Sequence, residues 1–211
     1  MELACGTGRL LVPFCQLGVD IEGLDISRDM LSICRKKLGE HNLRVALYEQ
    51  DLAKFDTGKQ YKIIFISGGS FQLLDDFQAA MSSLNHIYAH LLAGGQLILD
   101  LFPLWSEVQS NQEVSWRLGR TAENKKGEKF CCYERTELDP TNQIQRGQYK
   151  YELYRNGILV KTIMDNLNLR WYGRQEFKRI LEKTGFTNIR IENHALMSTH
   201  GESMVYYGYK S

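Results

Sequence analysis

Apolar residues follow two different spacings along this chain of 211 residues. Up to about residue 101, short continuous apolar runs alternate with segments in which apolar residues recur every three or four positions. The runs are typical of buried parallel strands, and the recurring segments predict amphipathic helices. Strands are expected at 19–24, 44–49, 61–67 and 96–101, and helices at 8–17, 28–38 and 76–92.

Breaker residues predict where these helices bend or stop. Pro13 is expected to cost the first helix one backbone hydrogen bond and to bend it slightly. Ser27 is a good N-cap for the second helix, Gly39 a stop signal for it, and Gly94-Gly95 a stop signal for the third.

Between residues 114 and 171 the apolar period drops to two, which is the spacing of strands with one buried face. Turn signals such as Asn156-Gly157 divide this stretch into four antiparallel strands, at about 114–120, 129–138, 143–154 and 159–171. Tyr149, Tyr151 and Leu153 share one face of the third strand. Helical spacing then returns at 174–183, before two final strands at 186–193 and 203–209.

This order predicts an α/β fold: a doubly wound, mostly parallel seven-stranded sheet with an antiparallel last strand, and an antiparallel β-sheet inserted after strand five. We interpret residues 1–211 as one domain and 112–171 as its inserted antiparallel β subdomain. The insert is too small and too one-faced to stand alone. It is therefore expected to pack on the main domain or to form a homodimer with a second copy.

Composition narrows the setting. Hydrophobic residues make up 43% of the chain and there are only 3 prolines, which indicates a globular protein. The net charge of +1 gives no general attraction to nucleic acid or to an anionic membrane. No apolar run reaches membrane-spanning length, and no signal peptide precedes the first motif. The 5 cysteines are scattered and odd in number, so we expect no disulfide framework and a cytoplasmic location.

The chemistry is concentrated near the start of the chain, in the run Glu2-Leu3-Ala4-Cys5-Gly6-Thr7-Gly8-Arg9. Its two glycines allow a tight turn and a close approach of the backbone to a ligand. The helix that follows points its free N–H groups at the same place. Asp25 follows the next strand, where a carboxylate can bind a ribose diol. This pattern predicts a nucleoside pocket.

Two kinds of nucleoside cofactor share that geometry. A nicotinamide site requires Gly-x-Gly-x-x-Gly, but the third glycine position is occupied by Leu11. The run instead resembles motif I of the class I S-adenosyl-L-methionine (SAM)-dependent methyltransferases, which ends Glu-x-x-x-Gly-x-Gly. An acidic residue at Glu2 suits a cofactor with an α-amino group and a sulfonium charge.

The resemblance implies a cofactor site built from several turns. The methionine end would lie against Glu2, Ala4, Gly6 and Gly8, and against the backbone of Ser67-Gly68 after the fourth strand. Asp25 would accept the ribose hydroxyls, and Ile26 and Met30 would pack on the adenine. Asp51-Leu52, after the third strand, would read the adenine amino group. The expected cofactor-binding set is Glu2, Ala4, Gly6, Gly8, Asp25, Ile26, Met30, Asp51, Leu52, Ser67 and Gly68.

The sequence says less about the residues that contact the methyl acceptor. Topology alone nominates Phe71, Asp100, Arg170 and Tyr172 as substrate contacts. No catalytic residue is assigned, because methyl transfer needs a general base only for a hydroxyl or a protonated amine. The layout resembles methyltransferases that act on amino sugars and related small molecules. Such relatives carry upstream residues that complete the first strand and cover the pocket, so we expect the first strand and this N-terminal lid to be truncated here.

Other functions stay open at this point. His86 and His90 have the i, i+4 spacing of a metal pair, but they lack an obvious third ligand, so no metal is expected. A non-catalytic SAM-binding or assembly protein and an NAD(P)-dependent oxidoreductase are the alternatives to a methyltransferase.

Overall fold

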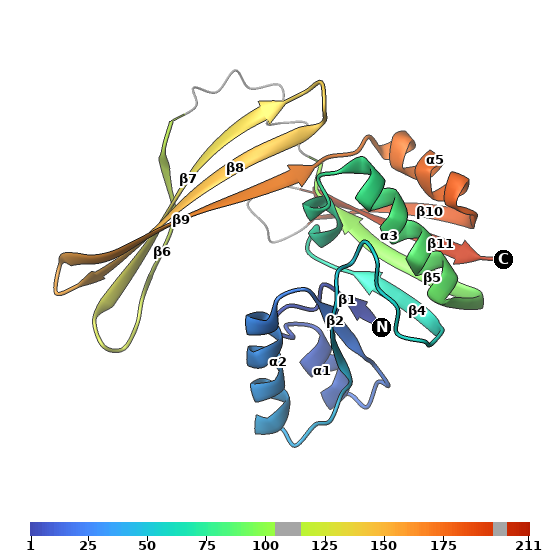
Figure 1. The fold of residues 1–211 in the computed structure, drawn as a ribbon, viewed down its shortest axis with the longest axis horizontal. Helices are drawn as coiled ribbons and strands as arrows, with labels where there is room; N and C mark the ends of the chain where they lie inside the picture. Colours follow the sequence, from blue (N-terminus) through green and yellow to red (C-terminus); the bar gives the residue numbers. More distant parts are fainter. Residues whose placement is uncertain (104–114, 196–201) are drawn as a thin grey trace. The chain divides into compact units, whose positions relative to one another are not determined.

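The computed structural model describes residues 1–103, 115–195 and 202–211. The chain forms two compact units, one of Met1–Pro103 with Tyr172–Ser211 and one of Leu104–Trp171. The first unit contains a seven-stranded sheet with helices, and the second contains a four-stranded sheet (Figure 1).

The sheet of the first unit runs in the order β10-β11-β5-β4-β1-β2-β3. Neighbours from β5 to β3 pair in parallel, whereas β11 is antiparallel to both β5 and β10. The predicted fold class, a mostly parallel sheet with an antiparallel last strand, is confirmed. Its strands are β1 (Glu2–Leu3), β2 (Gly23–Asp25), β3 (Leu47–Glu49), β4 (Tyr61–Ile66), β5 (Leu91–Leu101), β10 (Phe186–Ala195) and β11 (Glu202–Lys210).

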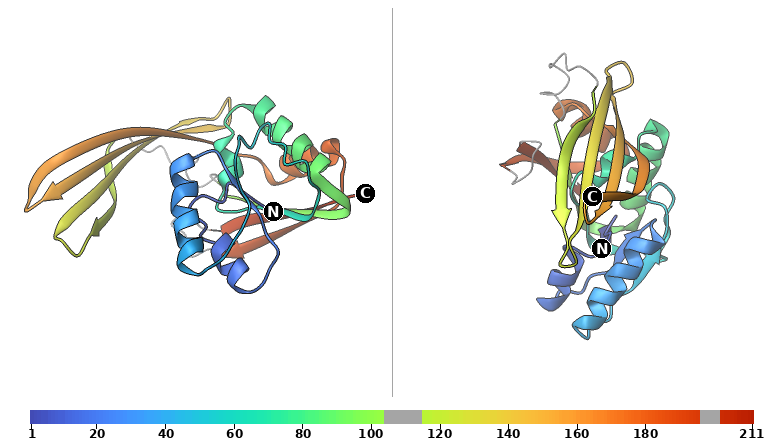
Figure 2. Two further views of the ribbon diagram at one scale, coloured as in Figure 1. Left: turned by 60° about the horizontal axis from the view of Figure 1, so that its bottom comes forward. Right: turned by 90° about the vertical axis from the view of Figure 1, so that its left-hand side faces the viewer.

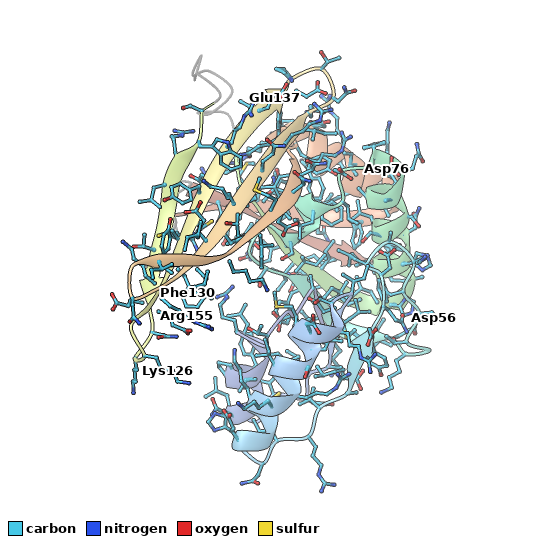
Figure 3. The ribbon with its side chains drawn as sticks, turned by 60° about the vertical axis from the view of Figure 1, so that its left-hand side comes forward. Asp56, Asp76, Lys126, Phe130, Glu137 and Arg155 are labelled. Atoms are coloured by element: carbon cyan, nitrogen blue, oxygen red, sulfur yellow. The ribbon has the colours of Figure 1, made fainter. Side chains whose placement is uncertain are left out.

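Two hydrophobic clusters account for the two faces of this sheet. The first cluster contains Leu84 and Phe177, from two helices that pack on the sheet, together with sheet residues such as Leu99. The second cluster contains Leu11 and Leu31, from the two other helices of this unit. Asp76 lies at the start of the long helix (Figure 3), where its carboxylate accepts from the Gln78 and Ala79 N–H groups. The helices are α1 (Leu11–Gln16), α2 (Arg28–Glu40), the 3₁₀ turn η1 (Ser70–Leu73), α3 (Phe77–His90) and α5 (Arg174–Thr184).

The structure corrects several expected boundaries. α1 begins at Leu11 rather than at residue 8, so Pro13 falls in its first turn, where a missing N–H costs no intrahelical bond. Ser27 caps α2 as expected by accepting from Met30 N–H at 3.3 Å, but the helix continues through Gly39 to Glu40.

Gly94-Gly95 does not end α3. That helix stops at His90 and the chain enters β5 directly at Leu91. Gly94 has φ +73°, and a Cβ on Gly95 would stand 2.8 Å from the Leu92 carbonyl oxygen. The two glycines therefore allow an irregular entry into the strand, where the pairing with β4 shifts between Tyr61 and Ile63.

The second unit is an antiparallel sheet of long curved strands (Figure 2) in the order β6-β7-β8-β9. Tyr151 lies opposite Cys132 on one side and Ile163 on the other. Asn156 (φ +50°) and Gly157 (φ +77°) make the turn between the last two strands. The start of the first expected strand, residue 114, lies outside the described residues. The strands are β6 (Arg117–Glu123), β7 (Glu128–Asp139), β8 (Ile144–Arg155) and β9 (Ile158–Arg170).

Across the ranges that the structure describes, no helix has the length and apolar character needed to cross a membrane.

Candidate cofactor site

The glycine turn, residues 4–9, connects β1 to α1 through three residues with positive φ. These angles are +54° for Ala4, +53° for Gly6 and +76° for Gly8. A Cβ on Gly6 would touch little, so glycine is favoured there by its backbone conformation. A Cβ on Gly8 would stand 2.6 Å from Cys34 Sγ of α2, so this glycine also allows close packing of the turn on that helix.

Asp25, at the end of β2, is held in place by backbone N–H groups of the glycine turn and of its own loop. Its Oδ2 accepts from Gly6 N–H at 2.8 Å, and its Oδ1 accepts from Ser27 N–H at 2.8 Å. Each carboxylate oxygen can accept a further hydrogen bond. The arrangement therefore presents two oriented acceptors beside the glycine turn, which is what a ribose diol requires.

Lys37 is a member of the site that the sequence reasoning missed. Its Nζ donates to the Thr7 carbonyl at 3.0 Å and to the Thr7 hydroxyl at 3.1 Å. The contact ties the middle of the glycine turn to the last part of α2, thirty residues further along. Only tertiary packing brings the two residues together, so no local motif could have indicated it.

The expected adenine contacts fall into two groups. Ile26 and Met30 are exposed beside Asp25, with Ile26 68% exposed, so both can receive a ligand. Asp51 makes a local turn by accepting from Ala53 N–H at 2.9 Å, and its other oxygen lies 4.0 Å from Lys54 Nζ. Leu52 is buried in the core. Its side chain supports the turn that carries Asp51.

Glu2 is an acidic side chain that is only 3% exposed. One side of its carboxylate accepts from the Leu11 N–H at the start of α1, and among the described residues Oε2 has no hydrogen-bond partner. Burial raises the pKa of Glu2 to about 7, against the opposing effects of the nearby Arg9 charge and the Leu11 N–H. A buried carboxylate with a vacant acceptor is stabilised by a cation or by further donors.

The turn after β4 is the second backbone element of the site. Gly68 and Gly69 have φ of +71° and +68°, and a Cβ on Gly69 would stand 2.5 Å from the Phe102 ring. The side chain of Gln72 holds the backbone of Phe102 in place. It accepts from Phe102 N–H at 2.7 Å and donates to the Phe102 carbonyl at 3.2 Å. Beside this turn, Ser67 has its carbonyl oxygen occupied by the Ser70 hydroxyl at 2.8 Å.

Asp100, nominated as a substrate contact, borders this turn. Burial raises its pKa, while hydrogen bonds from the Gly69 and Gly68 N–H groups and the charge of Arg9 oppose that effect. Its carboxylate therefore stabilises the glycine pair.

The other nominated substrate residues are placed differently. Phe71 and Tyr172 are buried, and both rings pack on Phe177, at centroid distances of 5.5 and 5.0 Å. Both rings therefore belong to the hydrophobic core, and their contact with a substrate stays a prediction. Arg170 lies in β9 of the second unit, where its Nη1 donates to the Asn142 carbonyl at 3.0 Å.

His90 uses both ring nitrogens within the protein. Nδ1 donates to the His86 carbonyl at 2.8 Å, because a carbonyl oxygen only accepts, and Nε2 lies 3.1 Å from Asp56 Oδ1. Within the described ranges, no group of three or more His, Cys, Asp or Glu side chains could hold a metal ion.

A family model described as a methyltransferase domain matches residues 1–95, the stretch that contains the glycine turn, Asp25 and the turn after β4. Residues 1–95, just under half of the chain, therefore match the methyltransferase-domain family. The family and the SAM cofactor expected from Glu2, Gly6 and Gly8 are confirmed.

Curated methyltransferases align with part of this chain. It is 31% identical over 108 residues to a dTDP-3-amino-3,4,6-trideoxy-alpha-D-glucopyranose N,N-dimethyltransferase from Streptomyces venezuelae, a match to 50% of this chain and 42% of that enzyme. It is 28% identical over 105 residues to a dTDP-3-amino-3,6-dideoxy-alpha-D-glucopyranose N,N-dimethyltransferase from Streptomyces fradiae, a match to 50% and 39%. The match thus spans about two fifths of the length of these relatives.

Solved methyltransferases share the fold over the whole chain. A SAM-dependent methyltransferase from Clostridium acetobutylicum has a TM-score of 0.79 at 17% identity, covering 100% of this chain and 82% of that one. A SAM-bound amino pentose methyltransferase from Micromonospora echinaspora has a TM-score of 0.74 at 19% identity, with the same 100% and 82% coverage. Both likenesses concern the fold, including the inserted antiparallel sheet.

Proposed function

We propose that this methyltransferase transfers a methyl group from SAM to a small-molecule acceptor by in-line displacement. The observation that carries the proposal is Asp25, whose carboxylate is fixed between the N–H groups of Gly6 and Ser27 and keeps acceptor capacity for a ribose diol. Leu11, which is buried at the start of α1, stands where a nicotinamide site requires its third glycine and disfavours that alternative.

We assign the cofactor-binding roles as follows. Ala4, Gly6 and Gly8 give the backbone its close approach to the methionine end, with Ser67 and Gly68 on the opposite side. Asp25 accepts the ribose hydroxyls, Ile26 and Met30 flank the adenine, and Asp51 accepts from the adenine amino group with Leu52 packed beneath it. The exposure of Ile26 and Met30 and the buried acceptor of Glu2 support this arrangement.

The bound cofactor supplies an activated methyl group on a sulfonium, so little chemistry is asked of side chains. The chain's part is to orient donor and acceptor and to exclude water from them. An amine acceptor would have to be held with its lone pair free and in line with the methyl group that the bound cofactor would supply. A general base is needed if that amine is protonated when it binds.

The acceptor class we favour is an amino sugar. The names of both curated relatives above are those of dimethyltransferases for dTDP-linked amino sugars. Incubation with labelled SAM and a panel of nucleotide-linked amino sugars, each paired with its hydroxyl analogue, tests this choice. Methylation of the amine but not of its hydroxyl analogue is expected, and methylation of neither would argue for a non-catalytic SAM-binding protein.

Cofactor binding itself is tested by calorimetry with S-adenosylhomocysteine. We expect the wild-type protein to bind it and Asp25→Ala to weaken binding at least tenfold, because the ribose loses both of its oriented acceptors. Asp29→Ala is a matched control, since Asp29 is an exposed carboxylate in the first turn of α2. Equal binding by wild-type and Asp25→Ala proteins, or binding of NAD in place of the adenosyl ligand, would contradict the assignment.

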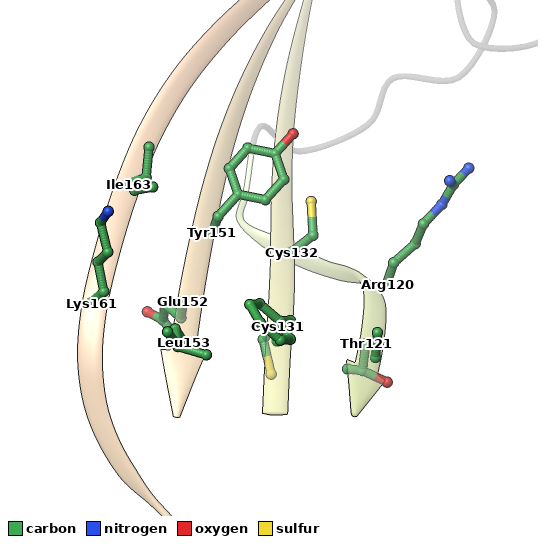
Figure 4. Close-up of a pocket in the computed structure, with 11 residues that line it drawn as sticks. Arg120, Thr121, Cys131, Cys132, Tyr151, Glu152, Leu153, Lys161 and Ile163 are labelled. Carbon is green, nitrogen blue, oxygen red and sulfur yellow. The ribbon is translucent and has the colours of Figure 1, made fainter. Parts of the chain in front are cut away.

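A second part of the proposal concerns assembly. One face of the inserted sheet carries Phe130, Tyr151, Ile163 and Leu167, which are exposed large apolar side chains. Phe130, Tyr151 and Ile163, with their neighbours, line a hollow of about 450 Å³ (Figure 4). Sheets bury such a face against another layer, and we infer that a second copy of the chain covers it.

Light scattering tests the dimer. The wild-type protein should have twice the chain mass, and Ile163→Lys should shift it toward the monomer, because a charge would enter the apolar face. Met164→Lys is the control, since Met164 is next in sequence, is similarly exposed and points to the opposite face. A strictly monomeric wild-type mass would refute this interface.

The compartment we assign is the cytoplasm. All five cysteines are free thiols, as a reducing environment would leave them.

A further inference from the structure

The peptide group between Thr7 and Gly8 is held from both sides. Its N–H, on Gly8, donates to the Cys5 carbonyl at 3.0 Å. Its carbonyl, on Thr7, accepts from Lys37 Nζ at 3.0 Å, and the same ammonium donates to the Thr7 hydroxyl at 3.1 Å. Glycine adopts several backbone conformations with similar ease, so Gly8 alone would leave this peptide free to rotate. The hydrogen bonds on its two sides therefore select one orientation.

The other anchors of the glycine turn lie on its β2 side. Cys5 N–H donates to a carbonyl of β2 at 2.9 Å, and Gly6 N–H donates to Asp25 Oδ2 at 2.8 Å. Thr7 follows these two residues at the middle of the turn. Within the described ranges, Lys37 supplies the only side-chain hydrogen bonds that Thr7 receives. The orientation of Thr7 therefore depends on α2 rather than on β2.

α2 contacts the turn at a second point, three residues before Lys37. A Cβ on Gly8 would stand 2.6 Å from Cys34 Sγ, so the helix surface and the Gly8 backbone are in close contact. Burial raises the pKa of the Cys34 thiol, and the charge of nearby Lys37 opposes that effect. The same helix carries Met30 in its first turn, at the adenine end of the proposed pocket. One helix thus supports both ends of that pocket.

We propose that Lys37 is a positioning residue of the cofactor site, which selects the conformation of the glycine turn that binds SAM. The inference rests on the proposed SAM site and adds to it a residue that acts on the cofactor through Thr7. Without the ammonium, the Thr7 carbonyl can turn to solvent and the turn populates more than one orientation. Only a fraction of the molecules is then competent to bind, and the apparent affinity falls by that fraction.

Calorimetry with S-adenosylhomocysteine tests this role. Lys37→Met removes both hydrogen bonds and should weaken binding about tenfold, whereas Lys37→Arg keeps a cationic donor and should stay within about threefold of the wild type. Thr7→Val removes only the hydroxyl acceptor, so it should cost about threefold with little disturbance of the fold. The double variant should bind no more weakly than Lys37→Met, because both substitutions remove one shared contact.

Lys36→Met is the matched control, since Lys36 is the exposed neighbour of Lys37 on α2 and the substitution removes the same charge. It should leave the affinity unchanged. The Gly8 amide resonance gives a second readout. In the ligand-free Lys37→Met protein this resonance should shift or double, and saturation with S-adenosylhomocysteine should return it to its position in the wild-type complex.

A contact that only stabilises the fold predicts a different result. Lys37→Met would then lower the free energy of unfolding in urea but leave both the affinity and the Gly8 resonance unchanged, and this outcome would overturn the assignment. Equal weakening by Lys36→Met would also overturn it, because the loss of charge alone would then explain the effect. Wild-type protein that does not bind S-adenosylhomocysteine would overturn the proposed SAM site, and this inference with it.

Discussion

Two carboxylates of the candidate cofactor site, Asp25 and Glu2, differ in burial and in hydrogen bonding. Asp25 is partly exposed and accepts one backbone N–H on each oxygen. Glu2 is buried, accepts from one N–H and keeps a vacant oxygen. Asp25 therefore suits neutral hydroxyl donors, whereas Glu2 is destabilised in the empty protein as an anion. The charged form of Glu2 therefore lowers the stability of the empty protein.

That loss has a definite pH dependence. Because burial raises the pKa of Glu2 to about 7, its contribution to stability is greatest below the unfolded carboxyl pKa and falls as pH rises through 7. By pH 8 the cost is about 3 kcal/mol. Glu2→Gln removes the charge, so urea unfolding at pH 8 should show a more stable protein, with little difference from wild type at pH 4.5.

Glu49→Gln serves as the comparison, since Glu49 is an exposed carboxyl at the end of β3 and the same substitution there removes no buried carboxylate. A Glu2→Gln protein less stable than wild type at pH 8 would show that Glu2 is satisfied in the empty protein.

At the scale of elements, the contact between the glycine turn and α2 depends on one missing side chain. A Cβ on Gly8 would lie 2.6 Å from Cys34 Sγ and 3.0 Å from a Val12 methyl group, and φ at Gly8 is +76°. Gly8→Ala should cost about 2–5 kcal/mol in urea unfolding, as the sum of overpacking and left-handed strain.

Gly18→Ala isolates the strain, because Gly18 has φ +79° with nothing within 4 Å of its Cβ position. It should cost only about 1–2 kcal/mol. If the added Cβ clashes with Cys34 Sγ, Gly8→Ala should destabilise a Cys34→Ala protein less than it destabilises the wild type. Additive losses of unfolding free energy in this double-mutant cycle would exclude the clash.

The elements also show what the sequence could and could not predict. The alternation of strand and helix, the cap at Ser27 and the positions of Gly6, Gly8 and Asp25 follow from local patterns, and the structure has them. Helix ends were less certain, because Gly39 and Gly94 are used inside an element or at a strand irregularity rather than as stops.

Tertiary contacts explain the remaining misses. Lys37 reaches Thr7 across thirty residues, and Gln72 holds the backbone of Phe102 across another thirty. Phe71 and Tyr172 follow strands, as substrate contacts would, yet they pack together with Phe177 in the core. No spacing rule distinguishes a ring that lines a pocket from one that supports it.

For the whole molecule, cofactor binding should stabilise one unit selectively. The glycine turn, Asp25 and the turn after β4 all belong to the unit of Met1–Pro103 with Tyr172–Ser211. S-adenosylhomocysteine at a hundredfold excess over its Kd should add about 2.7 kcal/mol to the stability of that unit. Hydrogen exchange should slow at β1, β2 and β4.

Amides in the centre of β7 and β8 provide an internal reference for this experiment, because they lie in the other unit. Their exchange should not respond to the ligand. Equal slowing in both sheets would show that the two units respond to the cofactor together, and unchanged exchange at β1 would contradict the proposed site.

The strand order has a consequence for how the chain is made. β5 pairs with β11, with Leu101 opposite Met204, so its edge stays open until about a hundred further residues have been synthesised. At about 5–20 residues per second this takes about 5–20 s. During that time Leu97, Leu99 and Leu101 form an unpaired apolar edge, which is a template for aggregation. Nascent chains of this protein should therefore depend on a ribosome-associated chaperone until β11 emerges and closes the sheet.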